Sequence, residues 1–391
     1  MAEAELPLRY GFNPNQVPAR LTIARDKMPF RVLNGSPGYI NMLDALNSWQ
    51  LVKELKHALD LPAAASFKHV SPAGAAVGLP LSDTLKKSYF VSDMELSPLA
   101  AAYARARGAD RVSSYGDWAA MSDTVDLPTA KLLNREVSDG VIAPGFDDDA
   151  IELLKSKKNG KYALLQIDPN YKPDELEIRE VFGIRFEQKR NNLEINSGFM
   201  ERVVTANRDL PPEALRDLIV ATITLKYTQS NSISFALDGQ AIGVGAGQQS
   251  RIHCTRLAGD KADRWYLRQH PTILDFKWKK GTGRAQRNNT IDLYLQDRLT
   301  PIEHTNLEDT LESVPAQLTQ KEKSDWLSNL TGVSLSSDAF MPFRDTVDRA
   351  HLSGVKYLVQ PGNSMRDDEV IKACNDYGMV MVFSGARLFH H

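Results

Sequence analysis

The sequence predicts a two-domain α/β protein, and three observations support this class. The chain has 391 residues, more than one hydrophobic core normally organises. Segments with helical and with strand-like apolar spacing alternate along it, which is typical of layered α/β folds. Hydrophobic residues make up 42% and charged residues 25% of the chain, values that are typical of a globular protein with a buried core.

The first half of the chain carries helix and strand signals in alternation. Residues 1–30 contain Pro7, Pro14, Pro18 and Pro29 and are predicted to be irregular. The elements expected after them are a helix over 41–58, a strand over 63–69 that enters a Ser-Pro-Ala-Gly turn, helices over 99–107 and 129–137, a strand over 141–145, a helix over 150–156 and a strand over 162–166.

The second half repeats the alternation after a polar connection. Asp238-Gly239 predicts a hairpin, because Asp-Gly supplies the positive φ of a tight turn. Ser250 is expected to cap a helix that ends near His270. The other elements expected are a helix over 215–226, hairpin strands over 233–237 and 240–244, strands over 357–359 and 380–383, and a helix over 368–377. We expect a first domain over 1–175, a connecting segment over 176–194 and a second domain over 195–391.

Charge and cysteine content argue against several classes of protein. Lys and Arg number 47 against 49 Asp and Glu, a balance that argues against a nucleic-acid or membrane-surface partner. The two cysteines, Cys254 and Cys374, indicate a reducing compartment rather than a disulfide framework. The first residues lack the apolar core of a signal peptide, and no apolar run reaches the ~18 residues of a membrane span. We therefore expect a cytosolic protein.

The stretch S-F-K-H-V-S-P-A-G, residues 66–74, places Lys68 beside His69 among small and apolar residues. One interpretation is purely structural: a strand end from which Lys68 extends to solvent while His69 is partly buried. The other is catalytic, because at a strand end both side chains can reach one cleft. There His69 accepts a proton and Lys68 stabilises a developing oxyanion.

Two further motifs are rich in groups that bind ligands. K-Y-T-Q-S-N-S, residues 226–232, is either a polar loop or a set of neutral hydrogen-bonding groups that fixes a polar heterocycle or ligates a monovalent cation through its oxygens. G-V-G-A-G-Q-Q-S-R, residues 243–251, lets the backbone approach a ligand before a helix N-terminus. Because position 248 is Gln, this loop lacks the G-x-G-x-x-G spacing, and no dinucleotide fold is predicted.

Several charged residues allow two interpretations. Arg9, Arg251 and Arg387 lie among Gly, Asn or Ser residues, as a phosphate site favours, although each is also explained as a surface arginine. Asp338 and Asp345 are either paired carboxylates or helix caps that pair with the neighbouring arginines at 344 and 349. Zinc is not expected, because H-E-x-x-H and P-C-x-x-C motifs are absent from the sequence.

A short internal echo is compatible with two related halves. Residues 65–71 read A-S-F-K-H-V-S and residues 223–229 read I-T-L-K-Y-T-Q. Both place a Lys before a ring-bearing side chain after an apolar run.

Seven ordered blocks of the sequence resemble one family, the aminoimidazole carboxamide ribonucleotide (AICAR) transformylase part of bifunctional AICAR transformylase/IMP cyclohydrolase enzymes. The resemblance extends from Leu8 to His391. The blocks are S-F-K-H-V-S-P-A-G-A-A-V-G, A-A-Y-A-R-A-R-G-A-D-R, R-E-V-S-D-G-V-I-A-P-G, K-Y-T-Q-S-N-S, G-A-G-Q-Q-S-R-I-H-C-T-R-L-A-G-D-K, S-D-A-F-M-P-F-R-D and R-L-F-H-H.

The resemblance implies a fold, a reaction and an assembly. The fold is a tandem pair of cytidine-deaminase-like α/β/α subdomains without zinc, which suits the internal echo. The reaction is formyl transfer from 10-formyltetrahydrofolate to AICAR in purine biosynthesis. The assembly is a homodimer with active sites at the subunit interface.

The resemblance also implies roles for single residues. His69 is the expected proton acceptor and Lys68 the expected transition-state stabiliser. The residues expected to line the AICAR site are Arg9, Tyr10, Gly116, Asp139, Asn231, Arg251, Phe340 and Arg387. Those expected to contact the folate are Ile252, Asp345, Ser364 and Met365. Some members carry a potassium ion near the counterparts of residues 226–232 and Asp338.

The resemblance begins within ten residues of Met1, so we expect that the smaller IMP cyclohydrolase domain is absent and that this chain does not close the purine ring. Two other functions compete with formyl transfer. A non-catalytic nucleotide- or folate-binding protein on the same fold is disfavoured by the presence of Lys68, His69 and Asn231 together. A zinc deaminase is disfavoured by the missing zinc ligands.

Overall fold

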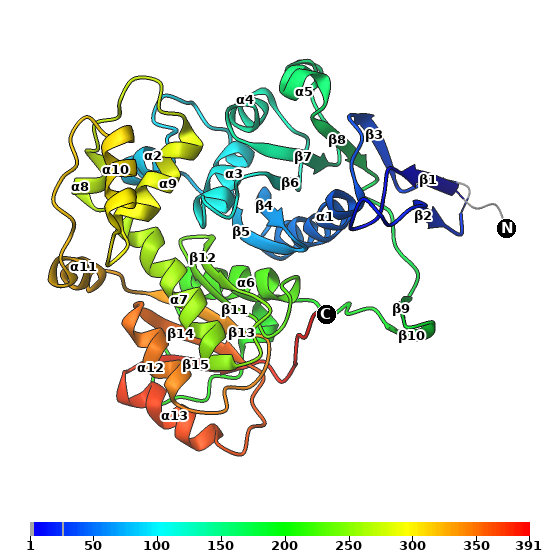
Figure 1. Ribbon diagram of the computed structural model, residues 1–391. Coiled ribbons are helices and arrows are strands. Elements are labelled where there is room, and N and C mark those ends of the chain that lie inside the picture. Colours follow the sequence, from blue (N-terminus) through cyan, green and yellow to red (C-terminus); the bar gives the residue numbers. More distant parts are fainter. Residues whose placement is uncertain (1–3, 26) are drawn as a thin grey trace.

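The computed structural model describes residues 4–25 and 27–391 of the chain. One eleven-stranded mixed sheet runs through the molecule, and helices cover both of its faces (Figure 1). This arrangement confirms the predicted α/β class. Within the described ranges, no helix is long and apolar enough to cross a membrane.

Both halves of the sheet contain the same succession of elements: a helix, a hairpin, and three parallel strands that alternate with helices. The first half consists of α1 (Tyr39–Leu59), β4 (Ala63–Lys68), β5 (Ser71–Val77), α2 (Asp83–Ser88), α3 (Pro98–Gly108), β6 (Asp117–Met121), α4 (Leu127–Arg135), β7 (Ser138–Ala143), α5 (Asp148–Gly160) and β8 (Ala163–Ile167). The second half consists of α6 (Pro212–Lys226), β11 (Ile233–Leu237), β12 (Gln240–Gly245), α7 (Arg251–Leu267), β13 (Val333–Ser337), α12 (Asp345–Leu352), β14 (Val355–Gln360), α13 (Asp367–Asp376) and β15 (Val380–Phe383).

Strand pairing is also the same in the two halves. In each, the first hairpin strand pairs antiparallel with the first of the three parallel strands. The halves join where β12 pairs antiparallel with β5, at Gln240 and Ala76. With β3 (Phe30–Asn34) added beside β8, the order is β15-β14-β13-β11-β12-β5-β4-β6-β7-β8-β3. Because the joining pair is antiparallel, β13 ends on the side of the sheet where β6 begins.

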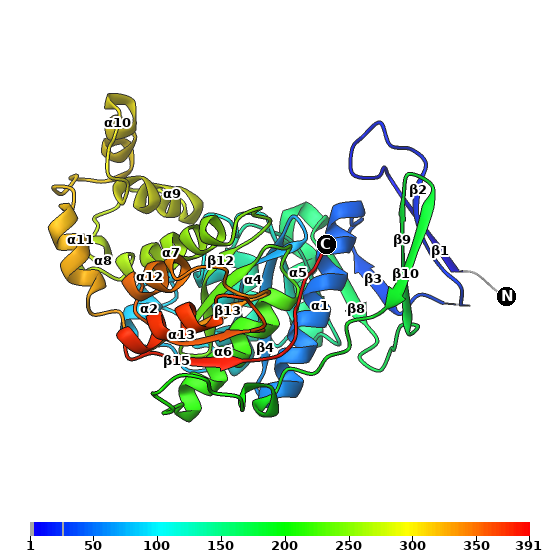
Figure 2. The same ribbon diagram turned by 90° about the horizontal axis from the view of Figure 1, so that it is seen from below.

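Apolar clusters fill both sides of the sheet. Helices α1 and α6 cover one face, with Trp49 and Leu218 in its core. Helices α3 and α7 contribute Tyr103 and Trp265 to the core of the other face. A third, smaller core holds together four helices between α7 and β13, which stand to one side of the sheet (Figure 2). They are α8 (Pro271–Leu274), α9 (Arg284–Tyr294), α10 (Pro301–Thr310) and α11 (Gln320–Leu327).

Several segments differ from the sequence predictions. Residues 1–30, predicted to be irregular, contain a hairpin of β1 (Ala4–Leu8) and β2 (Ala19–Ile23). The predicted connection contains a second hairpin, β9 (Leu176–Val181) and β10 (Ile184–Lys189), followed by the 3₁₀ helix η1 (Ser197–Met200). The prediction of a turn at Ser-Pro-Ala-Gly is wrong, because these residues begin strand β5. Strand β13 is an element that the sequence analysis missed.

The sequence echo between residues 65–71 and 223–229 does not correspond to the repeated topology of the two halves. Lys68 ends strand β4, whereas Lys226 ends helix α6, the counterpart of α1. The two Lys residues therefore lie at unrelated positions of the two halves. The division into domains at 1–175 and 195–391 stays a prediction, since the sheet continues through both halves.

Candidate active site

One side of the sheet collects residues from both halves. We call it the shared edge: the side where β6 and β7 begin and β13 ends. The backbone N–H of Gln229 donates to Ser71 Oγ across it at 3.4 Å, which links a loop of the second half to the β4–β5 hairpin. The predicted residues that lie at this edge are Lys68, His69, Gly116, Asp139, Asn231, Arg251, Phe340 and Arg387.

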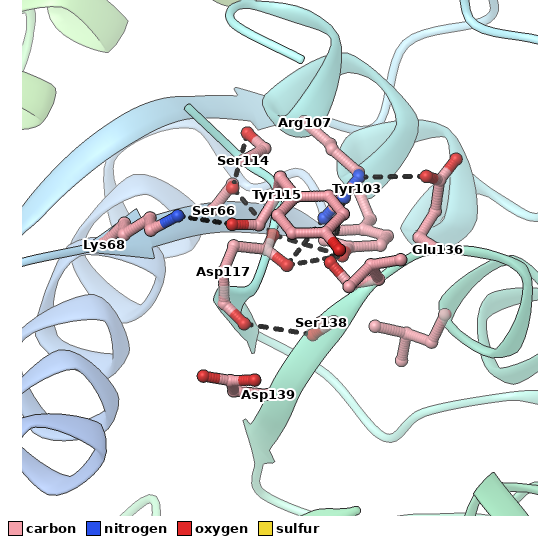
Figure 3. Close-up of polar contacts among 12 residues, drawn as sticks. Ser66, Lys68, Tyr103, Arg107, Ser114, Tyr115, Asp117, Glu136, Ser138 and Asp139 are labelled. Atoms are coloured by element: carbon pink, nitrogen blue, oxygen red, sulfur yellow. Dashed lines mark hydrogen bonds and ion pairs between the residues drawn. The ribbon is translucent and has the colours of Figure 1, made fainter. Parts of the chain in front are cut away.

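Lys68 points along the shared edge toward the start of β6. Its Nζ donates a hydrogen bond to the carbonyl oxygen of Tyr115 (Figure 3). The next residue, Gly116, has φ +72°, a conformation that glycine adopts without steric cost. No atom of the described residues lies within 4 Å of where a Cβ of Gly116 would sit, so there is open space beside the Lys68 contact.

A buried polar network supports both partners of this contact. Asp117, the first residue of β6, accepts a hydrogen bond from Ser66 Oγ at 2.7 Å (Figure 3). Ser66 Oγ also accepts a hydrogen bond from Ser114 Oγ, at 2.8 Å. Because Ser66 lies two residues before Lys68 and Ser114 directly precedes Tyr115, the network fixes the backbone on both sides.

Three arginines donate hydrogen bonds to Glu136, which joins this network through Arg107. Arg107 donates to Asp117 at 2.6 Å and to Glu136 at 3.2 Å (Figure 3). Glu136 also accepts from Arg111 at 3.0 Å and from Arg284 of α9 at 2.8 Å. Burial alone would raise the pKa of Glu136, but the three guanidiniums overcome it and lower the pKa to about 2. Through Arg284, Glu136 therefore links helix α9 to the buried polar network beside Lys68.

His69 and Val70 form the two-residue turn between β4 and β5. Their φ angles are 53° and 62°, in the left-handed region that residues other than glycine rarely adopt. The His69 side chain is exposed, and behind it the Val70 N–H donates to Asp44 Oδ1 of α1 at 2.6 Å. Burial raises the pKa of Asp44 to about 6, against the opposing effects of the Val70 and His69 N–H groups and the His69 ring.

Arg251, at the start of α7, is buried and engaged with the protein. It forms an ion pair with Asp338 and donates to Asn231 Oδ1 at 2.9 Å and to Ser232 O at 3.0 Å. The expectation that Asp338 pairs with the arginines at 344 and 349 is therefore wrong. Arg251 holds the Asn231 loop in place against the end of β13.

The C-terminal segment carries Arg387 to the same edge. The N–H of Leu388 donates to Asp338 O at 2.8 Å, and the N–H of His390 donates to Ser230 Oγ at 3.0 Å. The Arg387 guanidinium is exposed and lies 4.5 Å from the Phe389 ring centroid. Arg387 thus supplies an accessible cation beside the loops that precede β11 and follow β13.

The predicted folate residues lie on neighbouring loops and helix starts. Ile252 is the second residue of α7, and Asp345 is the first residue of α12, which follows β13. Ser364 and the exposed Met365 lie in the loop after β14. The carboxyl ends of parallel strands are where open α/β sheets usually bind ligands.

Arg9 and Tyr10 follow strand β1, outside the sheet. The Arg9 guanidinium lies 5.8 Å from the Tyr10 ring centroid. The Phe12 ring packs on Tyr39, the first residue of α1, with centroids 4.8 Å apart. This contact ties the loop to the end of α1 that faces the His69 turn.

One sequence interpretation of the second half is wrong, and one residue of the polar motif 226–232 is engaged by the protein itself. Lys226 Nζ pairs with Glu54 of α1 at 2.8 Å. Gly243 is needed for packing rather than for ligand approach, since a Cβ there would lie 2.1 Å from Ala258 O on α7. Sequence reasoning also missed Asp44 and Asp117. A charge within the apolar run M-L-D-A-L, residues 42–46, is the signal that could have found Asp44.

Comparisons of this sequence with known families and proteins agree with the site described above. The sequence model of the AICARFT/IMPCHase bienzyme family matches residues 1–261. The chain belongs to this family. It is 30% identical to the bifunctional purine biosynthesis protein PurH of Xylella fastidiosa (strain 9a5c) over 394 residues, and to that of Ruegeria sp. (strain TM1040) over 389 residues. Each match covers 98% of this chain but only 58% and 59% of the relatives, so the chain spans less than two thirds of their length.

Family membership confirms the resemblance at the level of a purine-biosynthesis family. The roles of the single residues stay predictions. Within residues 4–25 and 27–391, no group of three or more His, Cys, Asp or Glu side chains is placed to hold a metal ion.

Proposed function

We propose that this chain is a phosphoribosylaminoimidazolecarboxamide formyltransferase. It transfers the formyl group of 10-formyltetrahydrofolate to AICAR and releases formyl-AICAR and tetrahydrofolate. One observation carries the proposal: Lys68 and His69 lie at an edge that both halves of the sheet share. Membership of a family that contains AICAR transformylases supports it.

The chemistry requires a proton acceptor and a cation at the reacting centre. The AICAR amine is a poor nucleophile because it is conjugated with its ring, so His69 takes its proton as the nitrogen attacks the formyl carbon. Lys68 meets the negative charge that develops on the formyl oxygen, a contribution of about 10²–10³ in rate. The bond from this carbon to folate nitrogen then breaks, and that nitrogen receives a proton.

Substrate binding is assigned to the rest of the shared edge. Arg387, exposed beside the Asn231 loop, is suited to the ribotide phosphate. The folate is assigned to the loops after β13 and β14, near Asp345 and Ser364. Holding both substrates in one orientation supplies a large part of the rate gain. The equal strand order of the halves suits the proposed tandem of cytidine-deaminase-like subdomains.

A structural potassium ion fits the described residues poorly. Ser232 Oγ is buried beside Asp338 and has no hydrogen-bond partner within the described part of the chain. The Asp338 carboxylate, however, is already balanced by Arg251 and accepts from Ser230 Oγ at 2.7 Å. The negative charge of Asp338 is therefore already balanced without a cation.

The test of the reaction is an assay of the purified chain with AICAR and 10-formyltetrahydrofolate that follows tetrahydrofolate release. We expect turnover that depends on both substrates. Binding of AICAR without turnover would instead favour a non-catalytic nucleotide- or folate-binding protein on the same fold.

We also propose that the protein is a homodimer, with the β9–β10 hairpin at its interface. The hairpin stands away from the layers of the molecule (Figures 1 and 2), and two strands alone are marginally stable in water. It exposes Ile178, Ile184 and Phe186, and at its tip Phe182 is 100% exposed. Such a cluster of apolar side chains indicates a protein contact.

Phe182→Ser should weaken this dimer, because it removes the largest apolar group at the hairpin tip. We expect a shift toward monomer in light scattering and a lower specific activity on dilution. Ile302→Ser, at an exposed apolar residue of α10, is the control and should change neither property. A wild-type chain that is monomeric and fully active would refute the dimer.

A further inference from the structure

The two hairpins of the sheet are held by the same device. In each half, the sixth residue of the first helix is a buried aspartate. In the second half, Asp217 accepts the N–H groups of Asp238 and Gly239, both at 2.7 Å. In the first half, Asp44 accepts the N–H of Val70 at 2.6 Å.

The residues of the two turns nevertheless differ. Asp238 and Gly239 have φ angles of 51° and 74°, and Asp-Gly is among the pairs that such turns favour. His69 and Val70 adopt the same region, where a β-branched residue is a genuine outlier. Asp-Gly would serve a purely structural turn better. The first half thus keeps an imidazole at this turn despite backbone strain, and strain of this kind is typical of functional sites.

The charges around Asp44 favour an interaction with the imidazole. His69 stabilises the ionised carboxylate, whereas Asp139 of β7 opposes it. Asp139 is itself paired with Lys158 of α5 at 2.7 Å. A carboxylate behind a histidine that accepts a proton stabilises the imidazolium which forms, as in catalytic triads.

We infer that Asp44 is a positioning residue, which holds the strained His69 turn and stabilises the imidazolium when His69 accepts a proton. The inference rests on the proposed formyl transfer. It adds to that reaction a group buried on α1 that does not touch substrate, and it distinguishes Asp44 from its structural counterpart Asp217.

The test compares Asp44→Asn with the matched variant Asp217→Asn. For Asp44→Asn we expect kcat to fall about 10- to 100-fold, the loss that follows removal of one charged hydrogen bond, with unchanged KM values. Its melting temperature should stay close to that of the wild type, because asparagine keeps an oxygen that can accept the Val70 N–H. Asp217→Asn should lower the melting temperature, since both its oxygens accept hydrogen bonds, and should leave kcat unchanged.

Two pH measurements separate positioning from mere folding. The pKa of Asp44 is raised to about 6, so the ratio of wild-type kcat to Asp44→Asn kcat should shrink as pH drops through this value, because the wild-type carboxylate then becomes neutral. The NMR signal of the Val70 amide, which donates to Asp44, should move with pH through about 6 in the wild type and stay fixed in Asp44→Asn. This second readout needs no turnover, so it still decides the inference if formyl transfer itself is refuted. Unchanged kcat in Asp44→Asn, or a Val70 amide signal that moves in the same way in both proteins, would overturn the role of Asp44.

Discussion

Replacing His69 with alanine should lower kcat for formyl transfer by about 10²–10⁴-fold, the contribution of a positioned general base. The imidazole is exposed at the shared edge, on a turn between two buried strands. AICAR binding should persist, because ribotide recognition is assigned to other residues such as Arg387. Steady-state release of tetrahydrofolate and calorimetric titration with AICAR measure the two properties on the same protein.

The matched control for this experiment is His57→Ala. His57 is exposed in the last turn of α1, at the opposite end of the helix from Asp44, and its loss should leave kcat unchanged. If His69→Ala keeps full activity, the base assignment is wrong. If it loses AICAR affinity as much as it loses turnover, His69 binds the ribotide instead of taking a proton.

The two hairpin turns illustrate what the sequence can and cannot predict. Asp238-Gly239 predicts its turn correctly, because both residues tolerate positive φ. His69-Val70 carries no such local signal, and the prediction placed the turn three residues later at Ser-Pro-Ala-Gly. The turn forms where it does because β4 pairs with β5 and because Asp44 accepts the Val70 N–H. Both are contacts between distant parts of the sequence.

Helices were easier to predict than the outer strands. The apolar spacing of α1 and α6 is visible over several turns, and the prediction lay close to the observed bounds. Strands β1 and β2 are joined by a long loop, and β9 and β10 are almost wholly exposed. Both hairpins nevertheless carry alternation of apolar and polar residues, as in A-R-L-T-I of β2 and I-R-F-E of β10, and the prediction overlooked it.

The shared edge depends on one long-range pairing. Strand β12 meets β5 antiparallel, so the second half presents the carboxyl ends of its parallel strands where the first half presents the His69 turn. Single-sequence patterns do not encode that pairing. The resemblance to a family supplied most of the candidate residues, whereas Asp44 and Asp117 emerge only once the fold brings α1 and β6 against the turn.

Glu136→Gln should reduce the free energy of unfolding by about 3–5 kcal/mol, the usual cost of removing one partner from a buried ion pair. Glu136 is buried and accepts hydrogen bonds from Arg107, Arg111 and Arg284. Glutamine keeps the size and the oxygen acceptor but removes the charge. Arg107 would then keep its ion pair with Asp117, whereas Arg111 and Arg284 would lose the ion pairs that they form with Glu136.

The difference in stability between wild type and Glu136→Gln should depend on pH, because it requires Glu136 to be ionised. The pKa of Glu136 is lowered to about 2, so its stabilisation is present above its ordinary value near 4.5 and is lost as pH falls toward 2. Urea unfolding of wild type and Glu136→Gln should therefore converge in acid and differ most near neutral pH. Asp93→Asn removes an exposed partner of Arg135 and should cost less than about 1 kcal/mol at any pH. Equal losses in the two variants would mean that the buried arginines do not depend on Glu136.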